Sequence, residues 1–289
     1  MTKPDLATTE LPDYVIADIA RQVRAALEED IGSGDITAQL IPADAQANAT
    51  VITREAAVLC GTAWVDEVFR QLGNQVAVQW HYRDGDRVAA NDTLCTLSGN
   101  TRQILTGERS ALNFLQTLSG TATSARRFAD AVAGRDITIL DTRKTLPGLR
   151  TAQKYAVLCG GGQNHRLALY DAFLIKENHI AACGSISEAI RRARALAADK
   201  RIIVEVETLA ELEEAIAAAP DQIMLDEFAP EQTAAAAAAI GRGIIIELSG
   251  SFSLDKLVTL KAPAFPICLS SGSITKHVQA VDLSLRLQS

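Results

Sequence analysis

The chain lacks paired cysteines, a long apolar run and an excess of positive charge, and each absence excludes a class of protein. Its five cysteines form no CxxC pair and no metal-ligand spacing, so they fit buried thiols in a reducing cytoplasm. No apolar run approaches the ~18–20 residues that span a bilayer, and the first dozen residues are polar, unlike a signal peptide. The net charge of −7 gives no indication of the basic surface that nucleic-acid binding requires. We therefore expect a soluble cytoplasmic protein without membrane or nucleic-acid partners.

What the chain does contain is one pattern repeated six times between Ile137 and Gly272: a short apolar run that ends on a charged or small polar residue. The runs read ITILD, AFLIK, IIVEVE, IMLD, IIIELSGS and ICLSSG. Each has the length of a strand buried on both faces, and a helix-like segment follows most of them. This alternation predicts a parallel α/β sheet, often closed into a barrel, with the ligand site at the carboxyl ends of the strands.

The residues before this repeat predict a separate α+β domain. An amphipathic helix is expected at residues 13–30 and short strands with one helix at 49–105. A long helical region follows, and we expect an interruption around Ser119-Gly120 with the domain boundary beside it. The predicted division is an N-terminal α+β domain at residues 1–120, an α/β barrel domain at 121–274, and a tail at 275–289 that packs on the first domain.

Three further helices are predicted within the repeat. Ser185 with Glu188 and Thr208 with Glu211 have capping-box spacing, so a helix is expected to start after each serine or threonine. The six alanines of residues 234–239 predict a third helix, because alanine has the highest helix propensity.

Cations concentrate between Asp141 and His179, and Arg143, Lys144 and Lys176 stand at predicted ends of buried strands. A solvated helix face accounts for a residue such as Lys154, but it does not account for cations at strand ends. Arginine binds carboxylate or phosphate oxygens in a bidentate manner, and lysine acts as a mobile point charge. Several converging cations imply a substrate with two or more anionic groups.

Acidic residues end the following strands, at Glu205 and Asp226. Carboxylates beside a phosphate site commonly hold Mg²⁺, directly or through water, and they can stabilise a positively charged sugar transition state. Structural pairing with lysine or arginine is the alternative. Glu207 lies two residues beyond Glu205 and can share its role. Glu247, inside a strand, is interpreted as an ion-pair partner in the barrel interior.

Two loops of small residues follow the last two runs, Ser249-Gly250-Ser251 and Ser270-Ser271-Gly272-Ser273. Backbone N–H groups in such loops can bind a phosphate, aided by a helix N-terminus. Ordinary caps and turns have the same composition. Their position after two late strands of a barrel favours a phosphate site.

Several long motifs resemble the quinolinate phosphoribosyltransferase family. They are LDTRKTLPGLR, GGGQNHRLALYDAFLIKENH, VEVETL and IMLDEF, together with EEDIGSGDIT and GERSALNFLQTLSGTAT. The resemblance implies an N-terminal α+β domain and an irregular, open α/β barrel of parallel strands. It implies transfer of phosphoribose from phosphoribosyl pyrophosphate to quinolinate with Mg²⁺, giving nicotinate mononucleotide, pyrophosphate and CO₂ for de novo NAD biosynthesis. It also implies a homodimer in which each N-terminal domain covers the partner's barrel.

The resemblance further implies a role for each matching residue. Quinolinate would contact Arg143, His165, Arg166 and Lys176, and Arg109 of the partner subunit. Lys144 would bridge both substrates beside Thr142, and Glu205 and Asp226 would act at the ribose and its metal. The catalytic set is therefore Lys144, Lys176, Glu205 and Asp226, and the phosphate contacts are Ser249, Gly250, Ser251, Ser271, Gly272 and Ser273.

The chain departs from the family pattern on the phosphate side. Glu227 and Ser251 stand where the family usually has asparagine, and Phe265-Pro266-Ile267 replaces Gly-Val-Asp. Two alternatives stay open: a related enzyme of the molybdenum-transport-associated type with another substrate, and a non-catalytic binding protein on the same fold. The complete cation set and the presence of Asp226 favour quinolinate.

Overall fold

The computed structural model describes residues 10–228, 234–250, 252–260 and 262–288, and it forms two compact units. The first unit takes in the chain up to Arg127, Thr145–Gly161 and the segment from Ile274 onward. The second unit consists of Phe128–Lys144 and Gly162–Ser273. Within the described ranges, no helix has both the length and the apolar character that crossing a membrane requires.

The first unit contains a four-stranded antiparallel sheet in the order β12-β1-β5-β3. Along β1, buried side chains alternate with more exposed ones, as expected for a sheet with one solvated face, whereas the six residues of the edge strand β12 are all partly or fully exposed. The tail of the chain supplies an edge strand of this sheet, since Leu283 to Gln288 pair with β1. The strands are β1 (Gln46–Thr53), β3 (Val76–Trp80), β5 (Thr93–Asn100) and β12 (Leu283–Gln288), with a separate two-stranded ladder of β2 (Ala57–Val58) and β4 (Arg87–Val88).

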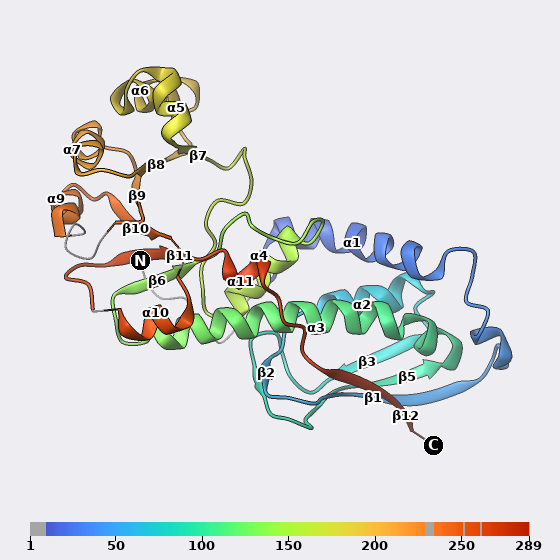
Figure 1. Ribbon diagram of the computed structural model, residues 1–289. Helices are drawn as coiled ribbons and strands as arrows, with labels where there is room; N and C mark the ends of the chain where they lie inside the picture. The colour runs from blue at the N-terminus through green and yellow to red at the C-terminus, as the bar shows by residue number, and fades with distance from the viewer. Residues whose placement is uncertain (1–9, 229–233, 251, 261, 289) are drawn as a thin grey trace. The chain divides into compact units, whose positions relative to one another are not determined.

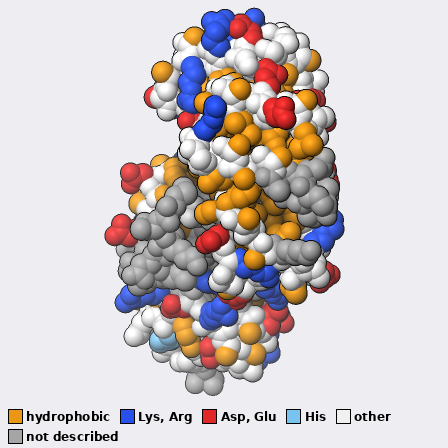
Figure 2. All heavy atoms as spheres, turned by 90° about the vertical axis from the view of Figure 1, so that its left-hand side faces the viewer, with side chains coloured by type: hydrophobic (Ala, Val, Ile, Leu, Met, Phe, Trp, Pro, Cys, Tyr) orange, Lys and Arg blue, Asp and Glu red, His pale blue; other side chains and the backbone are white. Residues whose placement is uncertain are grey.

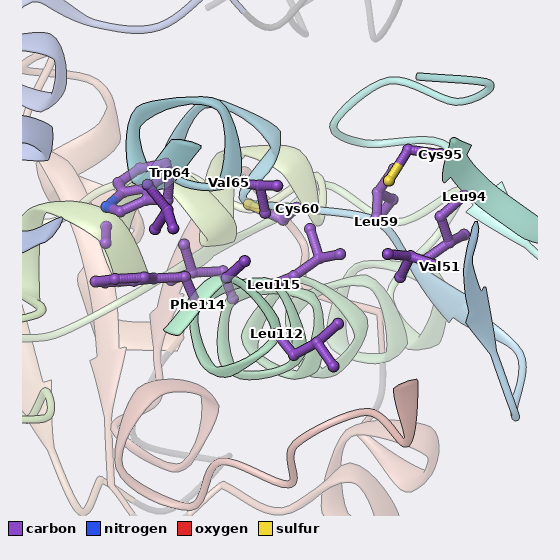
Figure 3. Packing of buried hydrophobic residues seen from close by; sticks show 14 of the residues in the cluster. Val51, Leu59, Cys60, Trp64, Val65, Leu94, Cys95, Leu112, Phe114 and Leu115 are labelled. Carbon is purple, nitrogen blue, oxygen red and sulfur yellow. The ribbon is translucent and has the colours of Figure 1, made fainter. Parts of the chain in front are cut away.

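Helices supply the rest of the core of this unit. Figure 3 shows Trp64 and Val65 of one helix facing Phe114 and Leu115 of another, beside Cys60. Burial of these large apolar side chains is the main stabilising term of the unit. The helices are α1 (Asp13–Ile31), α2 (Thr62–Gln71), α3 (Thr101–Ala131), α4 (Arg150–Cys159) and α11 (Ser273–Lys276), with a short 3-10 turn at Ala38–Leu40.

The expected interruption at Ser119-Gly120 is wrong, because α3 continues from Thr101 to Ala131 without a break. The side chain of Ser119 accepts a hydrogen bond from the backbone of Cys60 at 3.0 Å. A Cβ atom on Gly120 would lie 2.1 Å from the carbonyl oxygen of Gln279. Both residues are therefore small because another chain segment lies against the helix there, and not because the helix ends.

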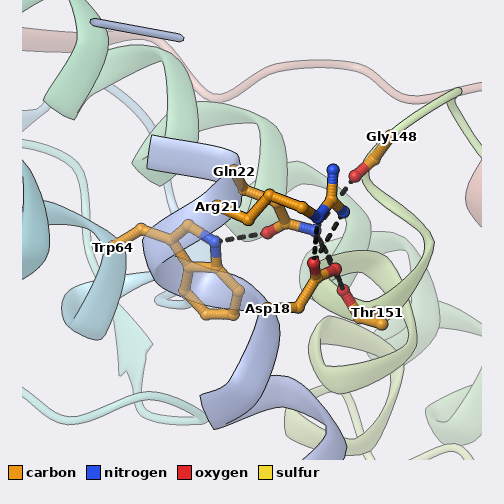
Figure 4. Close-up of polar contacts among 6 residues, drawn as sticks. All are labelled: Asp18, Arg21, Gln22, Trp64, Gly148 and Thr151. Carbon is orange, nitrogen blue, oxygen red and sulfur yellow. Dashed lines mark hydrogen bonds and ion pairs between the residues drawn. The ribbon is translucent and has the colours of Figure 1, made fainter. Parts of the chain in front are cut away.

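A buried polar cluster ties α1 to α2 and to the start of α4 (Figure 4). The indole N–H of Trp64 donates to the Gln22 side-chain oxygen at 2.8 Å. The Gln22 amide donates to the Gly148 carbonyl at 3.0 Å and to Asp18 at 2.9 Å. Thr151 also donates to Asp18, at 2.6 Å. Gln22 thus occupies the apolar face of α1 because the buried indole of Trp64 needs an acceptor.

The second unit is a six-stranded parallel sheet in the order β6-β11-β10-β9-β8-β7. Consecutive strands are neighbours throughout except β6 and β7, which form the two edges. This is the order of a barrel left open between its first two strands, and it agrees with the predicted fold class. The six predicted runs are all strands: β6 (Ile137–Leu140), β7 (Ala172–Ile175), β8 (Arg201–Val206), β9 (Gln222–Asp226), β10 (Ile245–Ser249) and β11 (Ile267–Ser270).

Helices follow most of these strands and lie along the outer side of the curved sheet (Figure 1). Ser185 and Thr208 are the N-caps of α6 and α7, each accepting a hydrogen bond from the backbone three residues on, as predicted. The alanine-rich segment is less regular than predicted, since a 3-10 turn at Ala234–Ala236 precedes one helical turn. The helices are α5 (Glu177–Cys183), α6 (Ile186–Leu196), α7 (Leu209–Ala218), α9 (Ala237–Ile240) and α10 (Leu254–Thr259).

The first stretch of the first unit ends at Arg127, since α3 carries the chain past residue 120 without a turn. The segment Thr145–Gly161, expected in the barrel domain, belongs to the first unit. The hydrogen bonds from Gln22 to Gly148 and Thr151 are part of what holds it there. The chain therefore crosses between the units several times.

Candidate functional site

A pocket of about 340 Å³ lies at the carboxyl ends of the strands of the second unit. In a parallel sheet these ends lie on one edge, so residues distant in sequence meet there. Eight of the predicted site residues line it, and four further residues join them. The lining residues are Thr142, Arg143, Lys144, His165, Arg166, Leu174, Lys176, Glu205, Met224, Glu247, Ser249 and Ser270.

The pocket wall carries four cations and two carboxylates, so it is locally positive in an acidic chain. Arg143 and Arg166 contribute the two guanidiniums. Burial and the nearby charge of Arg143 both lower the pKa of Arg166. The Nε atom of Arg143 is buried and has no hydrogen-bond partner among the described residues. An anion that binds between the two arginines would offset the repulsion of their like charges and accept a hydrogen bond from the unpaired donor.

Not every cation of this unit belongs to the pocket. Figure 2 shows Lys and Arg side chains gathered at the upper end of the face, the level at which Figure 1 draws α6. On α6, Arg191 and Arg192 are exposed and both contact Glu188 at 2.7 Å. Such i, i+3 and i, i+4 pairs are typical of a solvated helix face. These arginines are therefore surface residues.

Lys176 follows β7 and its ammonium contacts both carboxylate oxygens of Glu205, at 2.8 and 2.6 Å. Glu205 is 8% exposed, whereas the Lys176 side chain is 42% exposed. Structural pairing with a lysine, the alternative considered for Glu205, is thus present in the structure. The pair is open to solvent on the lysine side, so a ligand can compete for the ammonium.

His165 makes hydrogen bonds with three partners. Its backbone N–H donates to the buried Asp141 at the end of β6, at 2.8 Å. Its Nε2 lies 3.1 Å from Oε2 of Glu247 on β10, and its Nδ1 accepts the backbone N–H of Arg166 at 2.7 Å. Glu247 is therefore interior, as expected, and its partner there is a histidine, which makes an ion pair only when it is protonated.

Carboxylates that could hold a cation gather beside this pocket. Oxygen atoms of Glu177, Glu205 and Glu207 lie within 4.8 Å of one another. Asp226 is outside this group: it ends β9 opposite Ser249 in the register and does not line the pocket. Such a set of carboxylate oxygens fits Mg²⁺, which prefers oxygen ligands and retains part of its hydration shell.

The loops predicted to bind phosphate lie next to the pocket. A Cβ atom on Gly272 would lie 2.7 Å from the side chain of Lys144, so the glycine leaves room for that lysine. The Ser271 and Ser273 hydroxyls are 2.7 Å apart, and Gly250 has φ of +153°. Ser251 lies outside the described residues. Of the predicted loop residues that the structure describes, Ser249 and Ser270 are part of the lining.

Glu227 adopts φ of +52° directly after β9. This left-handed conformation is uncommon for residues other than glycine, and asparagine is enriched in it. The asparagine typical of the resembling family suits this backbone better than glutamate does. The glutamate at position 227 therefore carries a local cost in backbone conformation. Its carboxylate lies close to Gly250, where an added Cβ atom would be 3.2 Å away.

Arg109 lies in the first unit, on α3, and lines a separate pocket of about 320 Å³. Arg54 supplies a second cation there, and Glu108 and Asp282 supply carboxylates. The pocket of the second unit is lined only by residues of that unit. Arg109 is thus the one predicted quinolinate contact that the second unit does not contain.

Sequence reasoning missed Leu174 and Met224 as lining residues and Asp141 as an anchor. Leu174 precedes Lys176 by two residues, and Met224 precedes Asp226 by two. Side chains two apart on a strand leave the same face. This alternation would have identified Leu174 and Met224 as the apolar floor, since both pack with Ile203 in one small cluster.

Two family models match the chain. The quinolinate phosphoribosyl transferase N-terminal domain matches residues 35–119, and the corresponding C-terminal domain matches residues 121–286. Together they cover most of the sequence.

Individual relatives agree with the family models. The probable nicotinate-nucleotide pyrophosphorylase (carboxylating) of Bacillus subtilis (strain 168) is 41% identical over 258 residues, 89% of each chain. The Mycobacterium leprae (strain TN) protein named nicotinate-nucleotide pyrophosphorylase (carboxylating) is 39% identical and covers 93% of this chain and 98% of its own. The solved structure of the nicotinate-nucleotide pyrophosphorylase from Francisella tularensis has a TM-score of 0.89 at 46% identity, over 96% of this chain and 98% of that one.

Proposed function

This chain belongs to the quinolinate phosphoribosyl transferase family, and on that premise we propose that it makes nicotinate mononucleotide from quinolinate and phosphoribosyl pyrophosphate. The reaction releases pyrophosphate and CO₂ and belongs to de novo NAD biosynthesis. One observation of the site carries the proposal: Arg143, Arg166, Lys144 and Lys176 line a single pocket at the strand ends. Both substrates are polyanions, and the four cations of this pocket supply the positive charge that would attract them.

The pocket is also suited to a flat aromatic dicarboxylate. Leu174 and Met224 provide apolar surface, and the guanidiniums of Arg143 and Arg166 provide planar donors. An arginine binds a carboxylate in a bidentate manner, which fixes orientation as well as charge. We infer that the two arginines bind the carboxylates of quinolinate while the ring lies against the apolar side chains. Lys144 lies beside Gly272, and we infer that it contacts both substrates.

In the proposed reaction the pyridine nitrogen attacks C1′ of the ribose, and the C1′–oxygen bond to pyrophosphate breaks. The new N–C1′ bond leaves the ring nitrogen quaternary and positively charged. That charge stabilises the electron pair left on the ring carbon when the adjacent carboxylate departs as CO₂. A proton then adds to this carbon, and the ammonium groups of Lys144 and Lys176 are the candidate donors in the pocket. Such preorganised charge is often the largest catalytic term.

Mg²⁺ is part of the proposal. Glu205 would hold it, with Glu177 and Glu207 from the adjoining cluster and Asp226 as the further candidate, directly or through water. When bound with pyrophosphate it neutralises charge that develops on the leaving group. With Glu205 engaged in this way, the Lys176 ammonium that now pairs with it would be available to a substrate carboxylate.

We further propose that the active form is a cytoplasmic homodimer in which Arg109 of the partner subunit completes the quinolinate site. Arg109 lines an open, polar pocket of its own unit. Its side chain is therefore accessible to a ligand bound on another subunit. The five cysteines are free thiols, which supports a reducing compartment.

The test is turnover of quinolinate with phosphoribosyl pyrophosphate and Mg²⁺, followed by CO₂ release and by formation of nicotinate mononucleotide. Nicotinate in place of quinolinate is the control substrate, and it should not react. We expect Arg143→Ala to lower kcat/KM by about 10²–10³-fold, as loss of one well-placed charge does, with an unchanged far-ultraviolet circular dichroism spectrum. The matched control is Arg191→Ala on the solvated face of α6, which should retain full activity.

Absence of CO₂ release by the folded wild-type protein would reject the proposal. It would point instead to a related enzyme with another substrate or to a binding protein on this fold. Near-normal kcat/KM in Arg143→Ala would reject the site and leave the activity standing.

A further inference from the structure

Glu247 is a fully buried carboxylate in the middle of β10, and the proposed reaction does not use it. One of its oxygens, Oε2, is 3.1 Å from His165 Nε2 and also accepts from the Gln222 amide. The other oxygen, Oε1, has no hydrogen-bond partner among the described residues. Burying a carboxylate costs free energy unless hydrogen bonds compensate it. Glu247 also lines the pocket, so a role in the site is the natural explanation for that cost.

The contacts of His165 define which of its nitrogens carries the proton. A backbone N–H can only donate, so Nδ1, which receives the Arg166 N–H at 2.7 Å, must be the unprotonated nitrogen. The proton therefore lies on Nε2, which points to Glu247. Both ring nitrogens are then satisfied by the protein, and neither has a hydrogen bond left for a substrate.

The short segment of residues 164–166 is held between two buried carboxylates on different strands. Asp141, at the end of β6, accepts from the Asn164 amide at 2.7 Å and from the His165 backbone at 2.8 Å. Glu247 holds the other end through the His165 ring. This segment lies in the chain between β6 and β7, where the sheet is open.

Arg166 follows directly, and its position depends on these anchors. Its backbone N–H is the donor to the His165 ring, and its Nη1 donates to the Ala172 carbonyl on β7 at 3.1 Å. We propose that Glu247 is a positioning residue that acts through His165 to aim the Arg166 guanidinium, and that His165 makes no hydrogen bond to the substrate. This inference rests on the proposed function, because it concerns how the same pocket binds a carboxylate.

A double-mutant cycle tests the route from Glu247 through His165. Glu247→Gln keeps the shape and an acceptor but loses the charge that strengthens the bond to His165. His165→Asn keeps an acceptor near the Nδ1 position for the Arg166 N–H and removes the Nε2 donor. Glu213→Gln, exposed on α7, is the control for loss of one carboxylate.

We expect Glu247→Gln to raise the KM for quinolinate about tenfold, equivalent to about 1.4 kcal/mol, with the KM for phosphoribosyl pyrophosphate unchanged. Because the effect passes through His165, adding Glu247→Gln to His165→Asn should raise the quinolinate KM by less than about twofold further. Fully additive effects, or equal rises in both KM values, would overturn the proposal. Those results would indicate a general loss of structure.

Nitrogen-15 spectroscopy of labelled histidine gives a readout that needs no activity. The chain has four histidines, and His165 is assigned by its loss in His165→Asn. The folded protein should show a neutral His165 ring protonated at Nε2, and saturating quinolinate without the second substrate should leave that pattern unchanged. A ring protonated at Nδ1, or a new hydrogen bond to quinolinate, would refute the inference.

The two readouts separate this inference from the proposed function. A wild-type protein that does not turn over quinolinate rejects the function, while the His165 spectrum still reports the ring contacts. The wild-type spectrum also suffices if Glu247→Gln does not fold.

Discussion

Arg143 and Arg166 place two like charges in one pocket wall, and the charge of Asp171 offsets this only in part, since the pKa of Arg166 is still lowered. Lys176 is neutralised, but by Glu205, a residue with a second use in the proposed reaction. The site is therefore built from groups whose best partners are anions from outside. In this respect it differs from the two arginines of α6, which both pair with the carboxylate of Glu188.

Thiol reactivity is a prediction at the scale of single residues. Burial raises the pKa of Cys95 to about 12, and burial with the charge of Glu247 raises that of Cys268 to about 11. Burial also raises the pKa of Cys60 well above its ordinary value of 9.0. The thiolate is the reactive form. Iodoacetamide on the native protein should therefore modify only Cys183, the half-buried thiol on α5, as read by peptide mass spectrometry.

Unfolding in urea should make all five thiols react, which is the control for reagent access. Rapid labelling of Cys60 or Cys95 in the folded protein would contradict the packing of the first unit.

At the scale of elements, what surrounds a helix decides its course more than local propensity does. Gly120 lowers helix propensity, yet α3 continues through it because a neighbouring backbone lies against that face. Capping boxes behave differently: Thr208 and Glu211 bond each other's backbones within one turn, so their effect is local. This is why caps were predictable and the course of α3 was not.

Gly120→Ala tests the close approach in α3. Alanine would favour an isolated helix by about 1 kcal/mol. The clash with the Gln279 carbonyl should reverse that sign and lower the free energy of unfolding by about 1–3 kcal/mol, measured by urea titration. The comparison is Gly241→Ala, where the nearest atom would be 3.8 Å away and little change is expected. Greater stability of Gly120→Ala would exclude the contact.

Asp18 makes the link between α1 and α4 dependent on pH. Burial raises its pKa, but hydrogen bonds from Arg21 and Thr151 outweigh burial and leave the pKa below its usual 3.8. The ionised carboxylate therefore stabilises the fold above that pH, and the contribution is lost as pH falls through the lower folded-state value. Asp18→Asn should reduce the free energy of unfolding by about 1 kcal/mol at neutral pH.

The difference between Asp18→Asn and the wild type should shrink as the pH falls below 3.8, in urea titrations at a series of pH values. Glu29→Gln, exposed on the same helix, should change stability by less than about 0.5 kcal/mol. A difference that stays constant with pH would mean that the carboxylate charge is not involved.

At the scale of the whole molecule, each unit has a pocket that cations line: Arg54 and Arg109 in the first unit, and two arginines and two lysines beside Leu174 and Met224 in the second. Arg109 belongs to the first pocket. A homodimer that brings Arg109 to the partner's quinolinate site would explain why an exposed arginine belongs to the predicted site. Such a dimer predicts how much activity two inactive variants recover when their subunits mix.

Mixing two inactive variants, Arg109→Ala and Arg143→Ala, should restore activity. If subunits exchange at random, half of the dimers are mixed, and one of the two sites in each has both arginines. The expected recovery is about a quarter of wild-type activity, measured after mixing and re-equilibration. Mixing each variant with itself is the control. No recovery with proven subunit exchange would show that Arg109 does not act across a dimer.

The sequence by itself determined the six strands, the parallel sheet and the group of cations at its edge. These follow from short-range patterns: runs of apolar residues form buried strands, and a residue directly after a strand lies at its end. Arg143, Lys144, Lys176 and Glu205 therefore lined the pocket as the order of the runs indicated. Four of the six family motifs contain those strand ends, so the resemblance identified the same residues.

Only the tertiary structure decided which polar groups meet across the sheet and which segments belong to which unit. Glu247 contacts His165 because β10 and the segment after β6 face one interior, a contact between residues 82 positions apart. Thr145–Gly161 belongs to the first unit because Gln22 bonds it there. Contacts of this kind depend on how distant segments pack, and no local spacing records them.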